Sequence, residues 1–60
     1  GGNMQIGDLV KMRHVSLGLG VITRVNKRDL SFYKSHTYLV QFASHGGEWC
    51  LPDELEVVCK

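Results

Sequence analysis

The stretch that decides the fold lies at residues 46–58 and reads Gly46-Gly47-Glu48-Trp49-Cys50-Leu51-Pro52-Asp53-Glu54-Leu55-Glu56-Val57-Val58. The glycine pair supplies the positive φ angles of a short hairpin turn, so it predicts antiparallel strands on either side. Pro52 has no N–H to donate and suits the first position of a helical turn, which ends the strand that carries Trp49. Val57 and Val58 then favour a closing strand. A hairpin, one helical turn and a closing strand are typical of the end of a small β-barrel.

Three further strands are predicted upstream, at residues 6–13, 21–25 and 38–42. In the first, Val10 and Met12 share one face and alternate with Leu9, Lys11 and Arg13 on the other, as in a half-buried strand. In the third, the face expected to point into the core consists of Tyr38, Val40 and Phe42. Short strands with turn signals and no helical periodicity predict an all-β domain, a five-stranded barrel with one 3-10 turn before the last strand.

A long loop is predicted between the second and third strands, at residues 26–37, because the polarity of the sequence rises there. Phe32 and Tyr33 are the exceptions within it. Two roles are open for these aromatic side chains, since they can cover one end of the core or be displayed to a partner.

The chain has 60 residues, which is enough for one domain. We expect residues 1–5 to be a tag remnant or a flexible N-terminus, residues 6–58 to form the barrel and residues 59–60 to be the C-terminal end. No apolar run approaches the roughly 20 residues that a membrane span needs, so no membrane partner is expected. Cys50 and Cys59 are too few for a disulfide framework and are predicted to be reduced, although their spacing does not exclude a bridge.

Charge is unevenly distributed along the chain, although the net charge is only +1. Six of the seven basic residues precede residue 35, namely Lys11, Arg13, Arg24, Lys27, Arg28 and Lys34. Four of the six acidic residues lie between residues 48 and 56. Two interpretations are open: the domain has a basic face and an acidic face, or the two groups pair across neighbouring strands.

Four motifs resemble those of small SH3-like and Tudor-like proteins of bacteriophages and bacteria: Gly7-Asp8-Leu9-Val10, Gly18-Leu19-Gly20-Val21, Tyr38-Leu39-Val40-Gln41-Phe42, and Glu48-Trp49 followed by Leu55-Glu56-Val57. The resemblance covers residues 6–58 and implies an SH3-like barrel in the cytoplasm of a bacterial or phage-infected cell. The opening motif and the glycine-led second strand are similar to those of KOW domains, which bind RNA or protein.

The chain is also similar to type II dihydrofolate reductases in its length, its Gly-Asp opening and its Pro-then-Leu-Glu ending. Those enzymes are tetramers that line a central pore with a Val-Gln-Ile-Tyr run just before the proline. The corresponding run here, which ends at Leu51, contains no glutamine or tyrosine. The resemblance therefore implies an oligomeric enzyme of this kind only as a remote alternative.

Catalysis and metal binding are not predicted from the remaining residues. His14, His36 and His45 fall in predicted loops or strand ends, and no Cys-x-x-Cys or His-x-x-x-His spacing is present. Each Ser–His pair, at residues 35–36 and 44–45, consists of chain neighbours, which usually point apart, whereas a nucleophile and its base must lie within hydrogen-bond reach. We therefore expect a protein that is not an enzyme and has no metal or cofactor.

Two functions remain for a domain of this kind. Trp49 alternates with Glu48 and Cys50 and so shares a face with Leu51, and two positions are open for it, in the core or at the rim of the barrel. In the first function, Trp49 lies at the rim, and the domain binds a protein partner or a second copy of itself through the aromatic residues Trp49, Tyr33, Tyr38 and Phe32. In the alternative, the six basic residues named above bind nucleic acid phosphates while Phe32 or Tyr33 stacks on bases. An unbroken basic face favours nucleic acid, and acidic residues interleaved with the basic ones oppose it.

Overall fold

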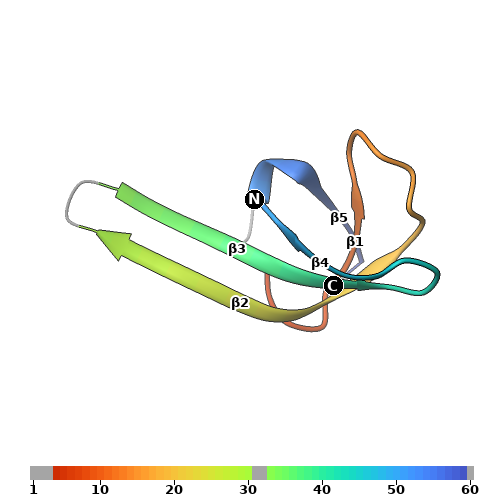
Figure 1. The fold of residues 1–60 in the computed structure, drawn as a ribbon, viewed down its shortest axis with the longest axis horizontal. Coiled ribbons are helices and arrows are strands. Elements are labelled where there is room, and N and C mark those ends of the chain that lie inside the picture. The colour runs from red at the N-terminus through yellow and green to blue at the C-terminus, as the bar shows by residue number, and fades with distance from the viewer. Residues whose placement is uncertain (1–3, 31–32, 60) are drawn as a thin grey trace.

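The computed structural model describes residues 4–30 and 33–59, and it confirms an all-β chain (Figure 1). Within these residues the elements are β1 (Leu9–Met12), β2 (Gly20–Leu30), β3 (Tyr33–Phe42), β4 (Gly46–Cys50), the 3-10 turn η1 (Pro52–Glu54) and β5 (Leu55–Cys59). Their side chains are described at residues 4–27 and 36–58. No helix in this part of the chain is long and apolar enough to cross a membrane.

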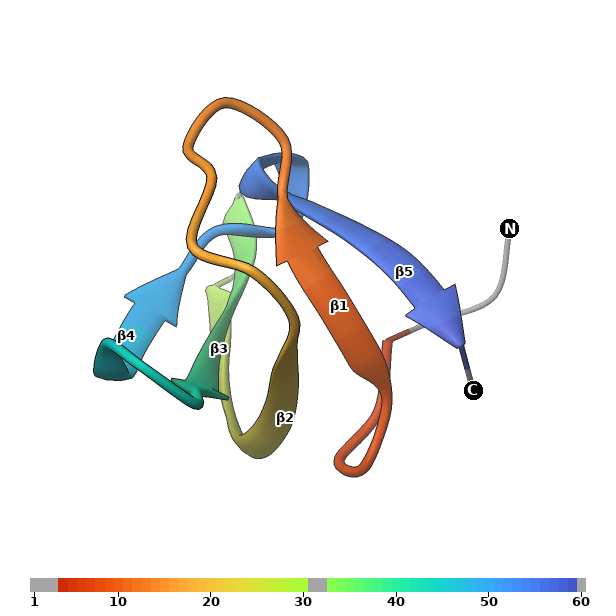
Figure 2. The ribbon, with the colours of Figure 1, turned by 90° about the vertical axis from the view of Figure 1, so that its right-hand side faces the viewer.

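The strands form one antiparallel sheet in the order β4-β3-β2-β1-β5. Register shifts between Leu9 and Val10 in β1 and between Ile22 and Arg24 in β2 interrupt the ladders. Such bulges increase local twist, and Figure 2 shows the sheet curling around its inner face. Over the described residues β4 and β5 do not pair with each other, so the sheet is not closed into a barrel.

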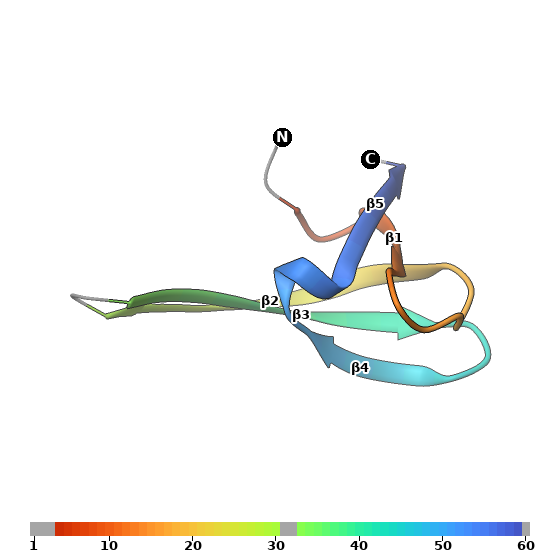
Figure 3. The same cartoon turned by 90° about the horizontal axis from the view of Figure 1, so that it is seen from above.

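The predicted loop at residues 26–37 is wrong, because β2 and β3 continue as one long hairpin. Its ladder runs from Asn26 opposite Thr37 to Leu30 opposite Tyr33. This hairpin projects beyond the rest of the fold (Figures 1 and 3). A two-stranded ribbon that leaves the core has water on both faces, so its sequence need not alternate between apolar and polar residues, and the usual strand signal is lost. Phe32, predicted to lie in the loop, is outside the described residues.

The hydrophobic core lies on the inner face of the curled sheet. The predicted inward face of β3 is confirmed, since Tyr38, Val40 and Phe42 are all buried. Val10 of β1 is buried and Met12 packs against the core, as the alternation of that strand predicts. The core is completed by Ile22, Cys50 and Leu55.

The predicted helical turn is confirmed and is held at both ends. The Glu54 carboxylate accepts a hydrogen bond from the Leu51 N–H at 2.7 Å, and the Glu54 N–H donates to the Leu51 carbonyl at 3.0 Å. The Arg13 N–H donates to the Glu54 carbonyl at 2.9 Å. These bonds place β5 alongside β1, where the ladder continues through Met12 opposite Leu55.

Asp8 is the one buried charged side chain among the described residues. Its Oδ2 atom accepts a hydrogen bond from the Gln5 N–H at 2.9 Å, and its own N–H donates to the Gln5 carbonyl at 3.1 Å. Two backbone hydrogen bonds join this segment to β2: the Gly7 N–H donates to the Ile22 carbonyl, and the Ile22 N–H donates to the Asp8 carbonyl. Asp8 therefore ties the segment that starts at Met4 to β2.

We predict that Asp8→Ala lowers the free energy of unfolding by about 1–2 kcal/mol, because it leaves the Gln5 N–H without its acceptor. Asp8→Asn is the matched control, since an amide oxygen can still accept this bond, and it should retain most of the stability. Urea denaturation followed by circular dichroism measures both. Equal losses in the two variants would contradict a role for the side-chain acceptor.

Candidate binding surface

Trp49 lies on the outer face of the sheet, opposite the core. Its side chain is 52% exposed, whereas the next residue, Cys50, is 1% exposed. Alternation along β4 explains the difference, because Cys50 pairs with the inward-facing Tyr38 of β3. The interpretation of Trp49 as a core residue is therefore wrong. Leu51, predicted to share a face with Trp49, is also exposed.

Trp49 belongs to a row of side chains that crosses three strands. It pairs with Leu39 of β3, which in turn pairs with Arg24 of β2. Leu39 is partly buried and Arg24 is exposed. The row therefore presents an indole, an aliphatic side chain and a guanidinium on one face, and tryptophan and arginine are enriched where proteins carry binding energy.

Gly47 contributes no side chain to the outer face beside this row. A Cβ at that position would lie 3.4 Å from Leu39 Cδ1 and 3.4 Å from Gln41 Oε1. Because residues two apart on a strand share a face, Gly47 and Trp49 are neighbours on the outer side of β4. One side of the indole thus has no β4 side chain next to it.

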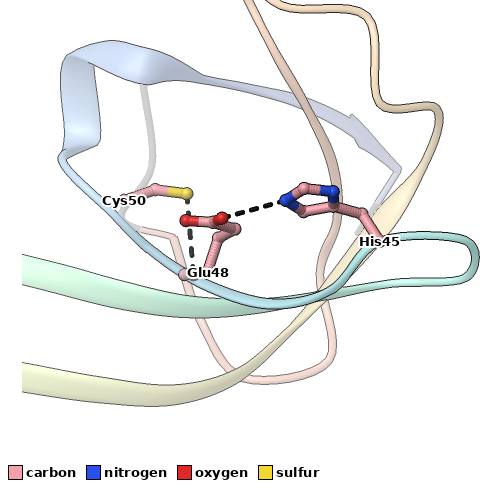
Figure 4. Close-up of polar contacts among 3 residues, drawn as sticks. All are labelled: His45, Glu48 and Cys50. Carbon is pink, nitrogen blue, oxygen red and sulfur yellow. Dashed lines mark hydrogen bonds and ion pairs between the residues drawn. The ribbon is translucent and has the colours of Figure 1, made fainter.

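The inner side of β4 carries a polar cluster at the same edge of the sheet. The His45 Nε2 and Glu48 Oε1 atoms are 2.9 Å apart, and the Cys50 thiol donates to the Glu48 carbonyl at 3.6 Å. Figure 4 shows these three side chains on one side of the strand, with the carboxylate between the thiol and the imidazole. The His45 ring also meets Phe42 edge to face, with 6.4 Å between ring centroids.

This cluster is not arranged for nucleophilic catalysis. Burial raises the pKa of the Cys50 thiol above its ordinary value, and the nearby Glu54 and Glu48 carboxylates raise it further. The reactive form of cysteine is the thiolate, which this environment disfavours. His45 bonds to a carboxylate and the thiol bonds to a backbone carbonyl, so neither contact activates the sulfur.

The raised pKa of Cys50 predicts a loss of stability in alkali. A thiol held neutral in the fold ionises more easily once the chain unfolds, so the fold is unaffected below about pH 8.5 and destabilised above it. We expect the free energy of unfolding to fall more between pH 8 and pH 10 in the wild type than in Cys50→Ala. Urea titrations across this range measure it, and parallel pH profiles would show that Cys50 does not titrate in this way.

The structure separates the predicted aromatic residues. Tyr38 is 4% exposed and faces the core, on the opposite side of the sheet from Trp49. Tyr33 begins β3 at the far end of the hairpin, and its side chain is not described; Phe32 is outside the described residues. The four aromatic residues proposed as one surface therefore do not gather around Trp49 as far as the structure describes them.

The basic residues are also distributed over more than one face. Lys11 Nζ lies 3.4 Å from Glu56, and Arg13 lies 3.7 Å from the same carboxylate. For these residues the cross-strand pairing of the two charge groups is confirmed. Arg24 and Lys27 are exposed, and they lie on opposite faces of the hairpin because they are three residues apart in a regular part of the ladder. Arg28 and Lys34 lie in the hairpin ladder, but their side chains are not described.

The histidines are distributed as separate side chains. His14 lies in the β1–β2 loop and His45 in the β3–β4 turn, as predicted, whereas His36 lies within β3 and packs edge to face against Tyr38. Among the described residues, no group of three His, Cys, Asp or Glu side chains is placed to hold a metal ion. Cys50 is a free thiol, and the Cys59 side chain is outside the description.

Two grooves were not predicted from the sequence. One, of about 580 Å³, lies where the hairpin leaves the core and is lined by Met4, Gln5, Ile6, Val25, Lys27, His36 and Tyr38. The other, of about 430 Å³, follows the loop from Lys11 to Leu19. The first depends on the pairing of β2 with β3 and on the position of the N-terminal segment, which no local sequence pattern reveals.

The fold and its exposed row define the class as a small all-β domain with a five-stranded antiparallel sheet over the described residues. Comparison with protein-family models, curated proteins and solved structures found no match for this chain.

Proposed function

We propose that this chain is a non-enzymatic interaction module with an SH3-like fold. The support for the fold is the strand order β4-β3-β2-β1-β5, with a 3-10 turn leading into a last strand that returns to the first. The two outer strands, β4 and β5, do not pair with each other over the described residues, so each keeps a free edge. The function assigned to the domain is the binding of a protein partner or of a second copy.

The observation that carries this proposal is the exposed Trp49 on an edge strand. Tryptophan buries a large apolar surface when it is covered, so an indole left half exposed beside Leu39 is suited to an interface. Leu51, also half exposed, lies two residues further along the chain. A partner that covers this face removes both side chains from water.

Nucleic acid is a second candidate, supported by the charge of the outer face. The described residues of that face in the ladders of β2, β3 and β4 include Arg24 and Asn26 but no carboxylate. Trp49 could then stack on a base while Arg24 contacts a phosphate. The pairing of Lys11 and Arg13 with Glu56 weighs against a wider basic surface.

The test is a photo-crosslinking amino acid placed at position 49 in the full chain, expressed in cells. Position 58 is the matched control, because Val58 is 49% exposed and lies on the opposite edge strand. We expect protein adducts, or dimers of the chain, from position 49 and not from position 58. Nucleic acid adducts at position 49 would favour the second candidate. Equal labelling from both positions would contradict a binding role for the Trp49 face.

A further inference from the structure

The outer edge of β4 is open to strand addition. Among the described strands β4 pairs with β3 alone, so its second edge carries backbone groups that no strand satisfies. Figure 3 shows β4 along one margin of the fold. An extended segment that adds to such an edge gains backbone hydrogen bonds, and its alternate side chains contact the two sides of the sheet.

The two sides of this edge differ in chemistry. On the outer side, an added strand meets the half-exposed indole of Trp49, beside which Gly47 contributes no side chain. On the inner side it meets Glu48, whose side chain stays 47% exposed while Oε1 contacts His45. The Glu54 carboxylate accepts a hydrogen bond from the Leu51 N–H at 2.7 Å, so a second carboxylate lies at the end of the same strand.

The opposite edge lacks this combination. Glu56 of β5 is exposed to the same extent as Glu48, but Lys11 and Arg13 already neutralise it. The exposed apolar residue of that strand is Val58, a much smaller side chain than an indole. Charge and apolar area therefore favour β4 as the receiving edge.

From these features we propose that β4 binds an extended segment of a partner protein in which apolar residues alternate with lysine or arginine. The apolar side chains pack against Trp49 on the outer side, and the basic ones face Glu48 on the inner side and Glu54 at the end of the strand. This assignment rests on the proposed function, for which it names the partner chemistry and the mode of binding.

The experiment is an NMR titration of the labelled full chain with a short, capped peptide of alternating lysine and valine. The control peptides have glutamate in place of lysine, or the same composition with all lysines at one end. We expect amide shifts centred on Gly46–Cys50 and slower hydrogen exchange there with the alternating basic peptide. Both control peptides should bind more weakly.

Variants test each side of the edge. Trp49→Ala should weaken binding about tenfold and Glu48→Lys about fivefold, as expected for loss of an aromatic anchor and of an exposed ion pair. Glu56→Lys is the matched control, because its carboxylate is equally exposed but lies on β5, and it should leave binding unchanged. Glu48→Lys should also bind the glutamate peptide better than the wild type does.

Equal binding of the lysine and glutamate peptides, or shifts centred on β5 or the hairpin, would overturn the assignment. Shifts induced by a single-stranded oligonucleotide, with none from peptides, would replace it with the nucleic acid candidate. If position 49 crosslinks a protein but no peptide perturbs β4, strand addition is wrong and the proposed function stands. If neither experiment gives a signal at β4, both are wrong.

Discussion

Gly20→Ala is expected to unfold most of the protein at 25 °C. A Cβ at this position would lie 2.5 Å from Val40 Cγ1 and 2.8 Å from Phe42 Cδ1, well inside van der Waals contact. The backbone cannot retreat easily, because Gly20 pairs with Phe42 on one side and Val10 on the other. Overpacking of a core costs about 1–3 kcal/mol or more, and a domain of this size has only a few kcal/mol of stability.

Gly47→Ala provides the control for this prediction. Its Cβ would lie 3.4 Å from the ends of two outer side chains that can move, so the cost should be below about 1 kcal/mol. Circular dichroism and the dispersion of amide signals measure the folded fraction. A Gly20→Ala variant as stable as Gly47→Ala would mean that the close contact of β2 with Val40 and Phe42 is incorrect.

Phe42→Ala is expected to destabilise the protein as much as Gly20→Ala does, because it leaves a cavity in the core instead of overpacking it. Phe42 is the largest of the fully buried side chains among the described residues. Its truncation leaves a cavity that a curled single sheet cannot readily fill. Phe→Ala substitutions in cores cost about 3–5 kcal/mol, which exceeds or equals the stability expected for a small domain. Amide signals should therefore collapse to the range of an unfolded chain.

Phe42→Leu makes the effect measurable if the alanine variant does not fold. It retains most of the apolar volume and should cost about 1–2 kcal/mol in urea denaturation. Leu19→Ala is the exposed control, since Leu19 is 53% exposed, and it should change stability by less than about 0.5 kcal/mol. Similar losses in Phe42→Leu and Leu19→Ala would contradict a core centred on Phe42.

Local sequence pattern predicted much of the fold, because turn residues and the alternation of apolar and polar side chains act over only a few residues. The hairpin turn was predicted in the right region, but it lies at residues 43–45, and both glycines belong to β4. Of the pair, only Gly46 has a positive φ, at 90°. Pro52 marks the 3-10 turn. The inward face of β3 followed from alternation alone. Local pattern does not reveal the hairpin extension, because a two-stranded ribbon that leaves the core need not alternate between apolar and polar residues, and a polar sequence predicts a loop.

The candidate site was predicted less well. Trp49 was identified from its residue type, but its two neighbours in the row, Leu39 and Arg24, come from other strands and are joined to it only by register. The same holds for Lys11 and Glu56, which are far apart in the chain and become directly opposite in the β1–β5 ladder. Which side chains lie next to each other on the surface depends on such pairings, and these cannot be read from the positions of the residues in the sequence.

The sequence by itself determined the all-β class, the 3-10 turn at Pro52 and the alternation of faces along β1, β4 and the core part of β3. It placed Trp49 and Cys50 on opposite faces of β4 without deciding which face is inside. Tertiary structure decided that, because Cys50 pairs with the buried Tyr38 and so takes the inner side, which turns Trp49 outward. The physical reason is that alternation is a local property of an extended backbone, whereas inside and outside exist only after strands have paired and the sheet has curled.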